Sequence, residues 1–225
     1  MAQPLIIYED NHIIVAEKPR NMPVQGDISG DMDFLSVIKE YVRVKYKKPG
    51  EAYIGLVHRL DRPVGGVMVF ARTSKAAARL SAAIKQGSFF KEYYAVVKGK
   101  PADEAVLRDY LLKDGKRNVS SIVKEGTVGA KYAELAYSLI EQRQNSSLLK
   151  VILKTGRAHQ IRVQLAGTGL PIIGDAKYGA GGRTLSLWSA RLGFEHPTKK
   201  EYVQFSYLPP NEWPWNLFEY INNDR

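Results

Sequence analysis

The chain of 225 residues is long enough to bury a hydrophobic core. Hydrophobic residues make up 44% and charged residues 25%, which argues against a disordered or fibrous protein. Lys and Arg outnumber Asp and Glu by 33 to 23, and this net charge of +10 favours a polyanionic partner, either nucleic acid or an acidic membrane surface.

The chain contains no cysteine, so it can form no disulfide, no thiol nucleophile and no cysteine-ligated metal site. No apolar run approaches the roughly 18 residues of a transmembrane helix. The first residues also lack the basic region and apolar core of a signal peptide. We therefore expect a cytoplasmic protein without a membrane partner.

Short apolar segments separated by turn-forming residues begin the chain. Residues 5–8 and 13–16 are predicted strands. Helical spacing of apolar residues over 34–41 predicts a helix that is capped by Asp33. The basic segment 43–52 is a predicted exposed loop, which either contacts phosphates or only keeps the protein soluble.

A strand, a helix and a series of further strands follow. Residues 67–70 are a predicted buried strand. The helix after it begins at Thr73 or Ser74 and ends at Gly87, because glycine suits the left-handed residue after a helix. Further strands are predicted over 93–97, 131–140, 148–153, 186–194 and 202–208, the second and third of these forming a hairpin.

The segment Thr155–Gly169 is a predicted helix capped by Thr155, with His159 and Arg162 on one side. No internal repeat or long linker interrupts the chain. The sequence therefore predicts one α+β domain over residues 1–225, built on a mixed, mainly antiparallel sheet with flanking helices.

Most of the polar and charged residues that could act in catalysis or binding lie in two short segments. In His58-Arg59-Leu60-Asp61-Arg62, the flanking arginines can keep Asp61 ionised when it is partly buried. An ordinary surface ion-pair cluster is the alternative interpretation.

In the second segment, Gly156 and a helix start offer backbone N–H groups to a phosphate or carboxylate, and Arg157 and Arg162 add positive charge. The alternative is a capped core helix with solvated arginines. His58, Asp61 and His159 could be combined into a metal site, but their spacing carries no ligand signal.

Three strings, HRLDRPVGGVMVFART, KEYYAVVKG and TGRAHQIRVQLAGTGLPIIGDAKYG, resemble the RluA-type family of RNA pseudouridine synthases. The strings IIVAEKPRNMPVQ and LWSARLGFEHPTKKEYVQF resemble further patterns of that family, so the resemblance spans most of the chain. Gly65 and Trp188 depart from it, standing where serine and histidine are frequent. The resemblance implies the pseudouridine synthase catalytic domain, without the separate N-terminal RNA-binding module that several members carry.

By this resemblance, Asp61 matches the catalytic aspartate and Tyr93 the active-site tyrosine. Arg162 matches the arginine that pairs with the catalytic carboxylate. Arg59 and Arg62 are candidates for holding the phosphates of a flipped-out nucleotide or for filling its vacated place. The full set of expected RNA-binding residues is His58, Arg59, Arg62, Arg157, His159 and Ile161.

The implied reaction is the isomerisation of specific uridines in structured RNA, either ribosomal or transfer RNA, by a monomer that uses no cofactor and no metal. Asp61 either attacks the anomeric carbon or removes a ribose proton. Two alternatives remain open. One is a non-catalytic RNA-binding or ribosome-assembly protein, and the other is a metal-dependent nuclease that uses His58, Asp61 and His159.

Overall fold

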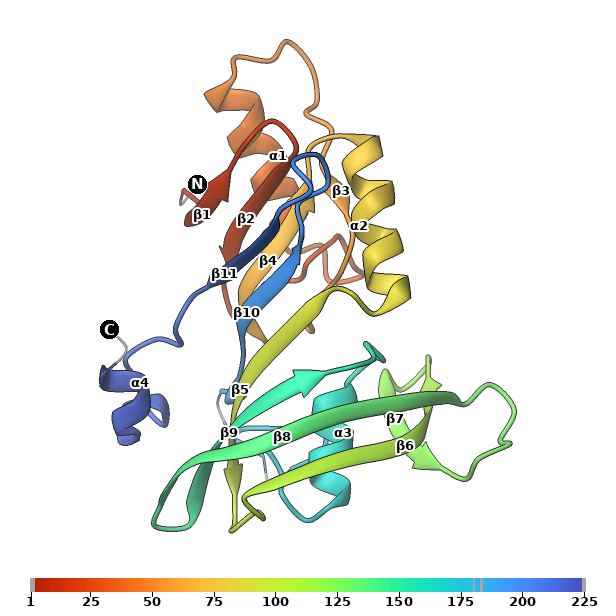
Figure 1. The fold of residues 1–225 in the computed structure, drawn as a ribbon, viewed down its shortest axis with the longest axis vertical. Helices are drawn as coiled ribbons and strands as arrows, with labels where there is room; N and C mark the ends of the chain where they lie inside the picture. Colours follow the sequence, from red (N-terminus) through yellow and green to blue (C-terminus); the bar gives the residue numbers. More distant parts are fainter. Residues whose placement is uncertain (1–2, 180, 183, 224–225) are drawn as a thin grey trace. The chain divides into compact units, whose positions relative to one another are not determined.

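The computed structural model describes residues 3–179, 181–182 and 184–223 of the chain. The chain forms two compact units (Figure 1). The first comprises Met1–Phe90 and Ser189–Tyr207, and the second Lys91–Trp188 and Leu208–Arg225. None of the helices in the described part is long and apolar enough to cross a membrane.

The first unit is built on a sheet with the strand order β1-β2-β4-β10, in which β3 also pairs with β4 and β11 with β10. The pairs β1–β2, β2–β4, β3–β4 and β10–β11 are antiparallel. The strands are β1 (Ile6–Glu9), β2 (Ile13–Lys18), β3 (Gly55–Leu56), β4 (Gly65–Ala71), β10 (Leu187–Glu195) and β11 (Tyr202–Ser206).

Two helices, α1 (Phe34–Lys45) and α2 (Ser74–Gln86), pack on this sheet through alternate residues of β4. Val69 faces a buried cluster that contains Leu80 of α2. The next residue, Phe70, points to the opposite face because side chains alternate along a strand. There its ring lies 5.6 Å from that of Phe34 in α1.

Both helices begin at their predicted caps. Asp33 Oδ1 accepts a hydrogen bond from the Ser36 backbone N–H at 3.0 Å, and Thr73 Oγ1 accepts one from Ala76 at 3.1 Å. The predicted start of the loop at residue 43 was wrong, because α1 continues to Lys45.

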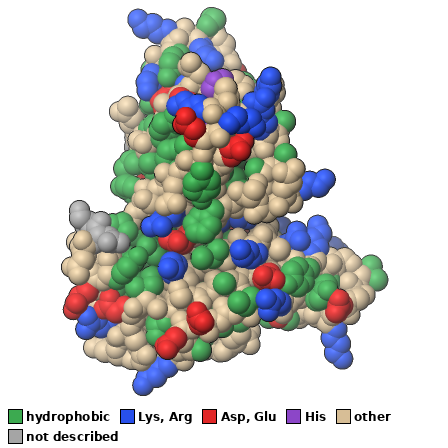
Figure 2. Space-filling view, viewed as in Figure 1, with side chains coloured by type: hydrophobic (Ala, Val, Ile, Leu, Met, Phe, Trp, Pro, Cys, Tyr) green, Lys and Arg blue, Asp and Glu red, His purple; other side chains and the backbone are tan. Residues whose placement is uncertain are grey.

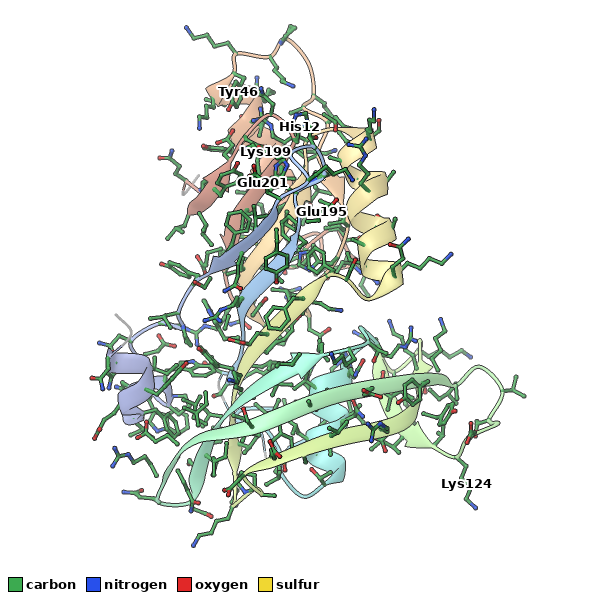
Figure 3. All side chains as sticks on the ribbon, viewed as in Figure 1. His12, Tyr46, Lys124, Glu195, Lys199 and Glu201 are labelled. Carbon is green, nitrogen blue, oxygen red and sulfur yellow. The ribbon has the colours of Figure 1, made fainter. Side chains whose placement is uncertain are left out.

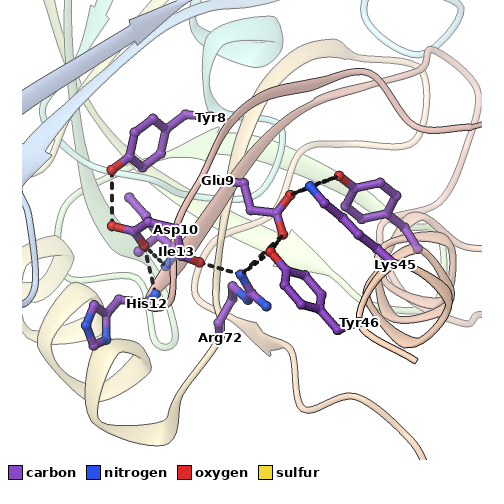
Figure 4. Close-up of polar contacts among 9 residues, drawn as sticks. Tyr8, Glu9, Asp10, His12, Ile13, Lys45, Tyr46 and Arg72 are labelled. Atoms are coloured by element: carbon purple, nitrogen blue, oxygen red, sulfur yellow. Dashed lines mark hydrogen bonds and ion pairs between the residues drawn. The ribbon is translucent and has the colours of Figure 1, made fainter. Parts of the chain in front are cut away.

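A buried carboxylate ties α1 to the ends of β1 and β4 (Figure 4). Glu9 accepts hydrogen bonds from Tyr41 at 2.9 Å, Lys45 at 2.7 Å, Tyr46 at 2.7 Å and Arg72 at 3.2 Å. Burial alone would raise the pKa of Glu9, but the bonds from Lys45, Tyr46 and Tyr41 outweigh it and hold the pKa below its ordinary value.

A second polar pair, between the buried His196 and the partly buried Asp10, joins the β10–β11 turn to the β1–β2 turn. Asp10 accepts from the His12 backbone N–H at 2.8 Å and contacts His196 Nε2 at 2.9 Å. Figure 3 labels His12 and Lys199 near these two turns. Lys and Arg side chains are distributed over the face shown in Figure 2.

The second unit is built on an antiparallel sheet with the order β5-β9-β8-β6-β7. The helix α3 (Gln160–Gly167) packs on it, with Val163 against Leu111 and Ala133. The β8–β9 hairpin is confirmed. The remaining elements are β5 (Phe90–Lys98), β6 (Glu104–Asp114), β7 (Val119–Val123), β8 (Lys131–Arg143), β9 (Ser146–Leu153), the short 3₁₀ helix Trp215–Leu217 and α4 (Glu219–Asn223).

The predicted Thr155 cap of α3 was wrong, because this helix starts at Gln160 with His159 as its cap residue. The Thr155 hydroxyl is used elsewhere. It accepts from the Glu134 backbone N–H at 2.9 Å and lies 2.7 Å from Gln160 Oε1. The threonine therefore holds the loop before the helix against β8. The mixed sheet with few helices confirms the predicted α+β class.

Candidate active site

Asp61 lies half-buried in the loop that enters β4. Its backbone carbonyl accepts a hydrogen bond from Val64 at 2.9 Å, which closes a turn directly before the strand. The strand begins with two glycines, and Gly66 has a φ of 118°. A Cβ atom there would lie 2.2 Å from the Ser189 carbonyl oxygen, so only glycine permits this close approach of β4 and β10.

A fully buried lysine fixes the backbone beside Asp61. The Lys18 ammonium donates to the carbonyl oxygens of Pro19 at 2.7 Å, Met22 at 2.7 Å and Arg62 at 3.1 Å. An ammonium group has three N–H donors, and each one therefore has an acceptor. Through Arg62, the lysine holds the residue that directly follows Asp61.

Lys18 is also electrostatically coupled to this carboxylate. Burial lowers the pKa of Lys18 from 10.5 to about 7, while the negative charges of Glu17 and Asp61 act in the opposite direction. Lys18 lies within the string IIVAEKPRNMPVQ, but the sequence predicted no role for it. The three carbonyls come together at Lys18 only when the loops are folded, and no local sequence pattern predicts that arrangement.

Arg62 holds the loop that precedes α1. Its Nε donates to the Asn21 carbonyl at 3.2 Å and its Nη1 to the Ser29 hydroxyl at 3.1 Å. Its Nη2 pairs with Asp31. Arg59, two residues before Asp61, is exposed. The RNA-binding roles of the two arginines stay predictions.

His58 packs against the backbone of β4. Its Nε2 accepts a hydrogen bond from the Val69 backbone N–H at 3.1 Å, and its ring lies 5.7 Å from that of Phe89. That nitrogen therefore has no free lone pair for a metal ion. Across residues 3–179, 181–182 and 184–223, no three His, Asp or Glu side chains are grouped as metal ligands.

The second unit contains Tyr93 and Arg162. Tyr93 is 6% exposed on β5, opposite Val151 of β9. Arg162 is 4% exposed on α3 and forms a two-pronged ion pair with Asp175, with Nε–Oδ2 at 2.8 Å and Nη2–Oδ1 at 2.7 Å. Its guanidinium carbon lies 5.2 Å from the centre of the Tyr178 ring.

Asp175 lies within the string TGRAHQIRVQLAGTGLPIIGDAKYG but was not predicted as a site residue. It also accepts backbone hydrogen bonds from Lys177 at 2.9 Å and Tyr178 at 3.1 Å. Burial would raise the pKa of Asp175, but Arg162 and these N–H groups hold the pKa below its ordinary value. Asp175 therefore stays ionised at neutral pH and fixes the direction of the arginine.

The remaining predicted residues of this unit lie around the start of α3. His159 Nδ1 contacts the Tyr178 hydroxyl at 2.7 Å, and that hydroxyl accepts from the Ser120 backbone N–H at 2.6 Å. Ile161 is buried, whereas Arg157 is exposed and donates from Nε to the Tyr132 carbonyl at 2.8 Å.

Comparison with known proteins identifies the family. Residues 12–167 match the family model described as RNA pseudouridylate synthase. Ribosomal large subunit pseudouridine synthase D of Zymomonas mobilis is 30% identical over 92% of this chain and 69% of the relative. An uncharacterized RNA pseudouridine synthase of Bacillus subtilis is 30% identical over 100% of this chain and 75% of the relative.

A solved structure shares the fold. Human RNA Pseudouridylate Synthase Domain Containing 4 superposes with a TM-score of 0.77 and 22% identity, over 92% of this chain and 88% of the other. Because the family match covers most of the chain and the relatives align along nearly all of it, the chain belongs to the RNA pseudouridylate synthase family, as its RluA-type motifs predicted.

Proposed function

We propose that this protein isomerises specific uridines in structured RNA to pseudouridine, with Asp61 as the catalytic carboxylate. The observation that carries the proposal is the setting of Asp61. It is half-buried in the HRLD string, inside the family match, and is followed by a backbone that the buried Lys18 holds in place. Large-subunit ribosomal RNA is the proposed first substrate, because two relatives carry that substrate class in their names.

The reaction conserves all atoms of the nucleoside. The bond between ribose C1′ and uracil N1 breaks, a bond between C1′ and C5 forms, and the proton of C5 is replaced by one on N1. Asp61 either attacks C1′ or removes a ribose proton. A uridine inside a stack hides its sugar bond, so the nucleotide must flip out at a cost of a few kcal/mol.

Two residues of the second unit complete the proposed set. Tyr93 supplies a flat ring for stacking of uracil, and its hydroxyl is proposed to lie near the C5 proton. Arg162 supplies a fixed positive charge, which is favourable for an ionised carboxylate. Arg59 is proposed to contact the RNA around the flipped nucleotide.

The test is a pseudouridine map of total RNA from cells with and without this gene. We expect one or more sites to disappear in the deletion and to return with the wild-type gene but not with Asp61→Asn. Asp103→Asn is the matched control, because it removes an exposed carboxylate from the same protein. A map that Asp61→Asn restores fully would refute catalysis by Asp61 and support a non-catalytic RNA-binding protein.

A further inference from the structure

Lys91, the second residue of β5, is a buried lysine in the second unit. It is 9% exposed. Within the described residues, its ammonium group forms no ion pair and no hydrogen bond. Burying an unpaired charge is costly, and native lysines at this level of burial are usually paired. The structure of the free protein therefore leaves a position for an anion at this ammonium group.

The surroundings of Lys91 include a glycine backbone and a second positive charge. A Cβ atom built on Gly156 would lie 3.4 Å from Lys91 Nζ, so the backbone of this glycine lies directly beside the ammonium group. Burial lowers the pKa of Lys91, and the positive charge of Arg157 lowers it further. A negative group bound beside Lys91 and Arg157 would gain charge-assisted hydrogen bonds and offset the repulsion between the two cations.

The strand places this anion position close to the proposed uracil platform. Lys91 and Tyr93 are two residues apart on β5, so their side chains point to the same face of the strand. Two residues of extended chain span about 7 Å. In a nucleotide, one ribose separates the phosphate from the base, so one nucleotide can reach both side chains.

We propose that Lys91, Arg157 and the Gly156 backbone bind a phosphate of the RNA next to the target uridine. The inference rests on the proposed function, because it takes Tyr93 as the surface that meets the uracil. The chemistry recognised is a phosphoryl group, which an RNA backbone and free phosphate share. We assign the site to the RNA.

Lys91→Met is the first test, because it separates binding from folding. Met keeps an unbranched side chain of similar length and removes the buried charge, so we expect the melting temperature to stay equal or rise. Affinity for a large-subunit ribosomal RNA transcript should fall about 10- to 100-fold, the effect of one lost charge-assisted contact. The log-log salt slope of binding should become shallower by about 0.7 to 0.9. A lower melting temperature together with unchanged affinity would overturn the proposal.

Gly156→Ala is the second variant, because its added methyl group occupies the anion position while contacting Lys91 only at van der Waals distance. We expect weaker RNA binding at unchanged melting temperature. Lys91→Arg should restore part of the affinity that Lys91→Met loses. Lys98→Met is the matched control, because it removes an exposed lysine from the same strand. Equal losses with Lys98→Met and Lys91→Met would overturn the proposal.

Binding is measured in the Asp61→Asn background, so that no product forms. Loss of affinity with Lys91→Met supports the anion site even if no pseudouridine is ever detected. If pseudouridine forms and Lys91→Met changes neither KM nor affinity, the anion site is refuted while the proposed function stands. Addition of inorganic phosphate tests whether the natural ligand is free phosphate or a phosphate of the RNA backbone. Stabilisation of wild type but not of Lys91→Met by phosphate, with RNA affinity unchanged, would refute the assignment to RNA.

Discussion

Replacement of Lys18 by methionine should change the stability of the protein in a pH-dependent way. The variant keeps an unbranched, largely apolar side chain but removes the N–H donors of Lys18, three in the ammonium form and two in the neutral form, from the carbonyls of Pro19, Met22 and Arg62. An orphaned buried carbonyl costs at least about 1 kcal/mol. We therefore expect the stability of the variant relative to wild type to fall as the pH rises.

The pH dependence follows from the buried amine. The pKa of Lys18 is lowered from 10.5 to about 7, so between these values the unfolded chain holds a proton that the folded protein does not. The free energy of unfolding of wild type then rises with pH by about 1.4 kcal/mol per unit. Lys18→Met lacks this contribution. The stability difference between the two proteins should therefore change by about 2 kcal/mol in favour of wild type from pH 7 to pH 9, because the slope is only half of its full value at pH 7.

The assay is urea unfolding of both proteins at half-unit pH steps from 6 to 9, followed by tryptophan fluorescence. Lys85→Met is the control, because Lys85 is exposed near the end of α2, and its stability difference from wild type should be constant with pH. A difference for Lys18→Met that stays flat, or that shrinks as pH rises, would refute a neutral amine in the folded protein.

Four further substitutions test the packing and the ion pairs. Gly66→Ala should destabilise by about 3 kcal/mol or more through backbone strain and collision with β10. A Cβ atom added at Gly87 has no neighbour within 4 Å, so Gly87→Ala should lower the free energy of unfolding by only about 1 to 2 kcal/mol. Equal losses for Gly66→Ala and Gly87→Ala in urea unfolding would contradict the role of the close approach to β10. Asp175→Asn should cost about 3 to 5 kcal/mol because it breaks the buried ion pair between Asp175 and Arg162, and a thermal melt matching wild type would argue against it. Glu9→Gln should cost about 1 to 3 kcal/mol at pH 7. That loss should vanish as pH falls through the lowered pKa of Glu9; a loss that persists at pH 2 would show that charge is not its cause.

Local signals in the sequence predicted the elements whose stability is local. The helix from Thr73 to Gly87 follows from a hydroxyl that bonds three residues ahead and from a glycine at a φ of 77°. The sequence did not predict the strands 104–114 and 119–123. In the first of them only Leu111 is buried, so the alternation of apolar and polar residues that marks a half-buried strand is weak.

The candidate site was predictable only where a motif marks it. The HRLD and HQIR strings pointed to Asp61 and Arg162. The partners that orient these segments were not found, because Asp175 meets Arg162 through a loop 13 residues away and Lys18 meets Arg62 across 44 residues. Such contacts depend on the path of the folded backbone, to which no short pattern is sensitive.

The first unit is discontinuous in sequence, and this affects how the chain can fold during translation. The cluster beneath α2 includes Leu192 and Phe194, both 0% exposed, beside Ile13 and Val15 from the N-terminal strands. The early part of the chain must therefore wait for more than a hundred later residues before this cluster closes. A nascent chain arrested at residue 188 would expose the apolar edge of β4, which is a surface that chaperones bind and that promotes aggregation.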